Sequence, residues 1–177
     1  MNADAQCVDA RSLLYFELEP TTLTADWRHC DKIANYLAGL ASFDRVDSFL
    51  YGNLFSTVLN ELFEIVFCQH APTGRVKCVL SRRGKGDRIE LEIPADERER
   101  EFYRRSVVAA QAPEVGDVYT KSLLSGENRD QAVGFLELAV DYGAKIQVEE
   151  PPGGRSLRLI VDVSLEEPRS SSTSAIS

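Results

Sequence analysis

The sequence is short of the residues that metal sites and nucleic-acid interfaces require. It has two histidines, and its four cysteines lack the close pairing of a metal site, standing at Cys7, Cys30, Cys68 and Cys78. We therefore expect reduced thiols and no metal. Cationic side chains are also in deficit, because 20 Lys and Arg stand against 28 Asp and Glu and the net charge is −8. A protein that binds the phosphate backbone needs a basic face, so we expect no nucleic-acid partner.

Long apolar runs are missing as well. No uninterrupted apolar stretch is long enough to cross a bilayer, and the opening MNADAQCVDARS does not read as a signal peptide. We therefore expect a cytoplasmic protein without membrane contact. Apolar residues nevertheless make up 44% of the chain, enough for the core of one domain. That domain is expected over residues 11–167, between a flexible N-terminus (1–10) and a disordered, serine-rich tail (168–177).

The spacing of apolar residues predicts an α+β fold. Alternating patterns predict strands over residues 12–20, 75–83, 86–94, 144–150 and 156–167. Helical spacing predicts helices over 24–41, 53–70, 95–112 and 129–143. A break is expected at Gly52, just before the second of these helices, and a short helical turn is expected within 114–128. The order β-α-α-β-β-α-α-β-β predicts a two-layer α/β sandwich, a mixed and largely antiparallel sheet with helices on one face.

Two glycine-rich segments are predicted to be hairpin turns. Pro151-Pro152-Gly153-Gly154 separates the last two strands, and Gly84-Lys85-Gly86 separates the second and third. The second of these segments also looks like a phosphate-binding loop. No helix follows it, however, so the hairpin turn is the preferred interpretation.

The apolar helix NLFSTVLNELFEIVFCQH carries an unexpected polar stripe. At about 100° per residue, Asn60, Glu61 and Glu64 fall on one face, while leucine, isoleucine, valine and phenylalanine cover the rest. Three interpretations remain open for this face, which are a solvated surface, a surface for a protein partner, and a catalytic or nucleotide site.

The element order resembles the histidine-kinase-like (GHKL) ATP-binding domain of gyrase, Hsp90, sensor histidine kinases, MutL and anti-sigma-factor serine kinases. Within that superfamily, VLNELFEIVF and GFLELAVDYGAKIQVE look most like the SiaB-like bacterial regulators. In the superfamily, the second long helix carries a Glu that orients water or a hydroxyl group, followed four residues later by an Asn that ligates Mg²⁺. The resemblance implies that Glu61 would be the base of an active enzyme.

Three nucleotide-binding signatures depart from the superfamily pattern. Ile65 stands where the Mg²⁺-binding Asn belongs, and isoleucine has no lone pair to offer. The glycine-rich loop that should follow the third strand is IPADERERE, with Asp96 but no glycine. The phosphate-facing glycine pair is Ala132 and Gly134, and Gly134 serves either a phosphate or close backbone packing on the sheet. We therefore expect a degenerate site without catalytic residues or cofactor, with ATP and Mg²⁺ as the alternative.

The resemblance implies a bacterial signalling regulator of the partner-switching type that acts by binding other proteins. The implied partners are a phosphatase, a STAS-domain protein or a response regulator. The vestigial cleft would supply the docking face, with candidate binding residues Asn60, Glu61, Glu64, Asp96 and Gly134. A homodimer is also expected, because the strand at Leu13–Leu18 is aromatic and often lies at a sheet edge in this fold.

Two other functions remain as alternatives. One is an active ATP-dependent serine kinase or ATPase that uses Glu61 as its base and recruits Mg²⁺ differently. The other is a binder of a small ligand, such as a flavin, that reuses the emptied cleft.

Overall fold

A computed structural model of the chain describes residues 10–21, 26, 28–69, 73–125 and 132–165. Five strands form one sheet in the order β1-β2-β3-β5-β4, and all four neighbouring pairs are antiparallel. The strands are β1 (Ala10–Leu18), β2 (Val76–Arg83), β3 (Gly86–Pro94), β4 (Lys145–Glu149) and β5 (Ser156–Val163). The predicted α/β sandwich with a largely antiparallel sheet is confirmed.

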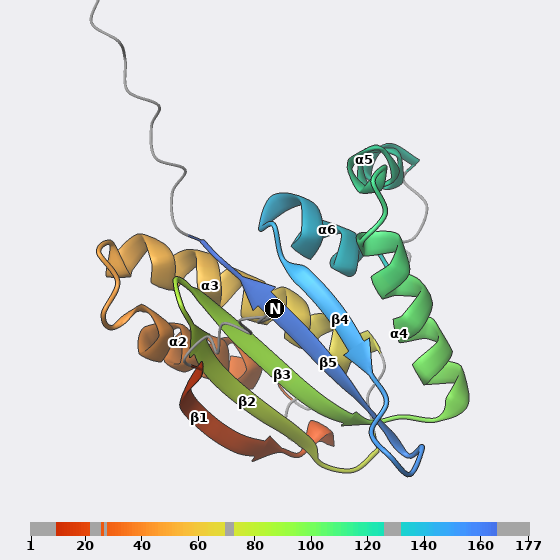
Figure 1. Ribbon diagram of the computed structural model, residues 1–177, viewed down its shortest axis with the longest axis horizontal. Helices are drawn as coiled ribbons and strands as arrows, with labels where there is room; N and C mark the ends of the chain where they lie inside the picture. Colours follow the sequence, from red (N-terminus) through yellow and green to blue (C-terminus); the bar gives the residue numbers. More distant parts are fainter. Residues whose placement is uncertain (1–9, 22–25, 27, 70–72, 126–131, 166–177) are drawn as a thin grey trace, which may run out of the picture.

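The helices lie on one side of this sheet (Figure 1). They are α2 (Arg28–Ser42), α3 (Ser48–Phe63) with its π-helical continuation η1 (Glu64–Gln69), α4 (Glu97–Ala110), α5 (Val115–Ser125) and α6 (Val133–Asp141). Helices α2 and α3 cross behind the sheet, whereas α4 contacts β4 and α6. The opposite face of the sheet is covered by none of the described helices (Figure 1).

The two-residue alternation of the strands builds the core. Each of the residues predicted to lie under the helices is at most 1% exposed, namely Ile89, Leu91, Ile93, Leu157, Leu159 and Val161. The turns around Gly84–Gly86 and Pro151–Gly154 join β2 to β3 and β4 to β5, and β3 pairs with β5 so that Leu91 stands opposite Leu159. Burying each such side chain contributes about 1.5–3 kcal/mol. The predicted register of the apolar face is therefore confirmed.

Two local expectations are wrong. Helix α3 runs from Ser48 to Phe63 without a break at Gly52. The missing side chain instead lets α2 come close, because a Cβ on Gly52 would stand 3.3 Å from Ser42 Oγ. Helix α5 extends over 11 residues where only a short turn was predicted. It is held by a small separate cluster in which Tyr119 packs with Val133 and Leu136 of α6.

Some predictions fall where the structure gives no description. The flexible N-terminus, apart from Ala10, and the disordered tail lie outside the described residues. Of the helices that are described, none has both the length and the apolar character needed to cross a bilayer.

Candidate functional site

The polar stripe of α3 ends where the helix changes its geometry. The backbone N–H of Glu64 donates to the carbonyl oxygens of both Asn60 and Glu61, and the six residues from Glu64 to Gln69 continue as a π-helix. Short π-helical segments are rare and are frequently found at functional sites. Six residues are too few for the period of the hydrophobic pattern to distinguish a π-turn from an α-turn.

Asn60, Glu61 and Glu64 are half-buried, whereas Asn53 and Thr57 on the preceding turns are exposed. The Oδ1 atom of Asn60 is buried and accepts no hydrogen bond from the described residues. A buried acceptor without a donor costs about 1–3 kcal/mol, so this orientation needs a compensating reason. The stripe is therefore not a fully solvated helix surface.

The stripe faces the end of α6. Burial raises the pKa of Tyr142, and the negative charges of Glu137, Glu61 and Asp141 raise it further. Since Tyr142 directly follows α6, Glu61 and the end of α6 are close enough to interact electrostatically. The structure thus brings the predicted acidic residue of α3 into the same region as the helix that carries Gly134.

Gly134 packs against Ile65. Ile65 is 1% exposed, and a Cβ built on Gly134 would lie 2.8 Å from its Cγ1 atom and 2.9 Å from its Cδ1 atom. These distances are well inside van der Waals contact, so a side chain at this position would require Ile65 to shift. The Cβ position of Gly134 therefore faces η1. Residues from two of the three altered nucleotide signatures thus meet in one contact.

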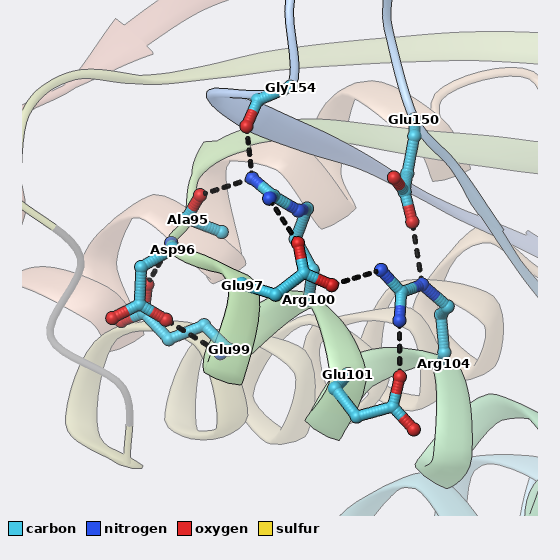
Figure 2. A network of polar contacts seen from close by, with 9 residues as sticks. All are labelled: Ala95, Asp96, Glu97, Glu99, Arg100, Glu101, Arg104, Glu150 and Gly154. Carbon is cyan, nitrogen blue, oxygen red and sulfur yellow. Dashed lines mark hydrogen bonds and ion pairs between the residues drawn. The ribbon is translucent and has the colours of Figure 1, made fainter.

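Asp96 caps helix α4. Its carboxylate accepts from the backbone N–H of Glu99 (2.8 Å), and the Glu99 carboxylate accepts from the backbone N–H of Asp96 (2.7 Å). This reciprocal pair is a capping box, which satisfies two backbone donors that have no partner within the helix (Figure 2). In the structure, Asp96 is the N-cap of α4. This role leaves its predicted role in partner binding open.

An arginine network links α4 to the β4–β5 hairpin (Figure 2). Arg104 donates to Glu97 (3.0 Å), to Glu101 and, across the gap, to Glu150 (2.6 Å). Arg100 and Arg104 together lower the pKa of Glu97. Glu97 and Glu101 lie on α4 itself, whereas Glu150 comes from the turn after β4. The network fixes the position of α4 against the sheet.

A buried charged cluster was missed by the sequence reasoning. The Asp87 side chain is 0% exposed and accepts from Arg45 Nη2 (2.8 Å), Arg82 Nε (3.0 Å) and Tyr51 Oη (2.7 Å). Burial and the bond to Asp87 raise the pKa of Tyr51 far above its usual range. The cluster fastens the α2–α3 connection to the β2–β3 hairpin. Its signal was available, because Asp87 shares the inward face with Ile89.

Comparison with known proteins gives one informative result. No family model matches the chain, and no curated protein matches it. A chain in the crystal structure of the SiaB–SiaC complex from Pseudomonas aeruginosa has the same fold, with a TM-score of 0.59 at 13% sequence identity. The match covers 86% of this chain and 90% of that chain. The shared fold agrees with the SiaB-like resemblance, and at this identity it is the fold alone that is shown.

Proposed function

We propose that this protein is a bacterial signalling regulator that works by binding a protein partner, and that it does not turn over ATP. The contact between Ile65 and Gly134 carries this proposal. Mg²⁺ requires oxygen ligands in near-octahedral geometry, and the resemblance would bring both the ion and a phosphate to these two positions. The aliphatic side chain of Ile65 occupies the space beside the Gly134 backbone instead.

The surface of the protein supports a role in protein binding. Several large apolar side chains are exposed among the described residues. Phe43 in the α2–α3 connection is 88% exposed, Phe49 in the first turn of α3 is 80% exposed, and Leu124 near the end of α5 is 81% exposed. Contiguous exposed apolar groups mark surfaces that bind other proteins.

The proposed docking face is the half-buried stripe with the charged helix α4. Asn60, Glu61 and Glu64 are half-buried polar side chains that would contact the partner. The partner classes implied by the resemblance are a phosphatase, a STAS-domain protein or a response regulator. The same fold occurs in a chain of the SiaB–SiaC complex. This is consistent with binding to a protein partner.

Thermal unfolding with nucleotide tests the first half of the proposal. A ligand present at a hundred times its dissociation constant stabilises a fold by about 2.7 kcal/mol, which moves the melting temperature by several degrees. We expect no shift with millimolar Mg·ATP or Mg·ADP. We also expect none in Ile65→Asn, because the segment after β3 still lacks glycines. A magnesium-dependent shift in the unmodified protein, lost in Glu61→Ala, would make it a kinase or ATPase.

Binding to purified candidate partners tests the second half. Proteins of the three partner classes encoded beside this gene are titrated against the immobilised chain. Reversing the charge in Glu64→Arg should weaken the complex about tenfold or more, since a misplaced interfacial charge costs several kcal/mol. Asp31→Arg, an exposed acidic position on α2, is the matched control. Equal binding by both variants would remove the stripe from the docking face.

A further inference from the structure

A cavity of about 500 Å³ opens at one end of the sheet, and none of the stripe residues Asn60, Glu61 and Glu64 lines it. It lies where the β2–β3 hairpin, the end of β5 and the start of β4 come together, and ten residues line it, namely Arg83, Lys85, Gly86, Asp87, Arg88, Gly143, Lys145, Asp162, Val163 and Ser164. Its volume falls within the range of small-molecule sites, roughly 300–1,000 Å³. We propose that this cavity binds a small molecule through its phosphate group, independently of the proposed function.

The charges around the cavity favour an anion. Four cationic side chains line it against two carboxylates, in a protein whose net charge is −8. Both carboxylates already have cationic partners. Asp162 accepts from Arg88 Nε and Nη2, at 2.6 Å each, and Asp87 is held from behind by Arg45 and Arg82. Neither carboxylate therefore opposes a bound phosphate with an uncompensated charge.

Two of the cations have no partner in the described part of the chain. Arg83 and Lys145 form neither an ion pair nor a side-chain hydrogen bond there, and the Nε atom of Arg83 is buried without an acceptor. Arg83 therefore has no described carboxylate to neutralise its charge beside the cavity. The planar guanidinium of arginine presents paired donors that match the oxygens of a phosphate.

The hairpin turn gives the cavity its opening and its rigidity. Gly86 stands opposite Arg83 in the strand register and has no side chain to fill the space. A Cβ there would lie 2.6 Å from the carbonyl oxygen of Val163, so β5 excludes any larger residue. The carbonyl oxygen of Lys85 accepts from Arg45, which ties the turn to the buried Asp87 cluster. The Gly84-Lys85-Gly86 hairpin turn thus forms part of the wall of the proposed anion site.

The roles of the cations follow from this geometry. Arg88 is already engaged by Asp162, and the charges of Glu90 and Glu149 also act on it, so it orders the wall of the cavity. Arg83 and Lys145 are left to contact the phosphate. Lys145 sits beside Asp162 in the strand register, which places it on the same outer face as Arg88.

Calorimetric titration at low salt tests the proposal, with inorganic phosphate, pyrophosphate and AMP as probes. We expect saturable binding of at least one probe, weakened about tenfold or more in Arg83→Gln and in Lys145→Gln, which is the loss of one charge-assisted contact. Arg83→Lys should bind with intermediate affinity, because it keeps the charge and loses the paired donors. Comparison of AMP with the inorganic ions separates a phosphate monoester from free phosphate as the ligand.

The matched controls are Lys77→Gln and Arg158→Gln, which remove cations from the other end of the same sheet. These variants should bind as the unmodified protein does, and melting temperatures establish that all variants are folded. Two results would overturn the proposal. One is no saturable binding of any probe up to about 10 mM, where affinity is negligible. The other is equal weakening by the control substitutions, which would indicate charge attraction without a site.

Discussion

The side chain of Ile65 lies so close to Gly134 that a methyl group added to the glycine would meet it at 2.8 Å. Ile65 belongs to the π-helical turn η1 and Gly134 to the first turn of α6, so one contact joins the two elements around the candidate site. Its tightness depends on the absence of a side chain at residue 134. Several measurable consequences of this and other contacts follow from the structure.

Gly134→Ala should destabilise the protein by about 1–3 kcal/mol, the usual cost of overpacking a core, although alanine is the better helix former. Gly39→Ala is the matched control. Gly39 also lies in a helix, but nothing stands within 4 Å of its Cβ position, so that change should stabilise by about 0.5–1 kcal/mol. Urea denaturation of both variants measures the difference.

A double-mutant cycle assigns the Gly134→Ala effect to Ile65. Ile65→Ala alone should cost about 2–5 kcal/mol, because it leaves a cavity in the core. In the Gly134→Ala background its cost should be smaller by about 0.5–3 kcal/mol, since the new methyl group enters the vacated space. Strictly additive effects would show that the strain of Gly134→Ala arises elsewhere.

Asp87→Asn should destabilise the fold by about 3–5 kcal/mol, because it leaves the two buried guanidinium groups of Arg45 and Arg82 without their shared carboxylate. Asp44→Asn is the comparison. Asp44 pairs with the same Arg82, but its side chain is 53% exposed, so its loss should cost no more than about 1 kcal/mol. Similar losses of unfolding free energy in the two variants would contradict a buried role for Asp87.

Substitutions of Asp96 separate its role as a helix cap from the predicted role in binding. Asp96→Ala should cost about 0.5–2 kcal/mol, because the N–H of Glu99 loses its acceptor. Asp96→Ser keeps a good N-cap and should stay within about 0.5 kcal/mol of the unmodified protein, while removing the charge. If the serine variant is stable and still binds a partner normally, Asp96 acts only as a cap.

Homodimer formation through β1 is a further prediction. β1 is at one edge of the sheet, and Tyr15 on it is 55% exposed. Edge strands present unpaired backbone donors and acceptors that a second copy can use. Sedimentation at high micromolar concentration should show a dimer, and Tyr15→Lys should shift it to monomer, because charged residues discourage pairing of edge strands. A monomer in the unmodified protein would end this idea.

The strands and their inward faces were predictable from the sequence, because alternation is a local property that burial enforces over the whole length of a strand. Ile89, Leu91 and Ile93 on β3 face the helices as predicted. The end of α6 at Gly143 and the turn at Pro151–Gly154 were predictable from their glycines. Gly143 and Gly154 take positive φ angles of 61° and 63°, which glycine adopts readily.

The features that the sequence did not yield depend on contacts between distant residues. The π-helical segment Glu64–Gln69 has only six residues, which is too short for periodicity to reveal it. The contact of Gly134 with Ile65 and the convergence of Arg45 and Tyr51 on Asp87 require the packed fold. Helix α5 was underestimated because Tyr119 packing on α6 holds it, a contact that the sequence does not reveal.

The strand order has a consequence for how the chain is made. β1 leaves the ribosome before the other described strands, and its neighbour among them is β2, whose Arg83 pairs with Ala10. Helices α2 and α3 emerge between them and can pack on each other at once, because their contacts are close in sequence. We expect nascent chains that end before β2 to protect the helical pair from protease while β1 remains cleavable. Protection of β1 in such chains would show that it docks before its partner strand exists.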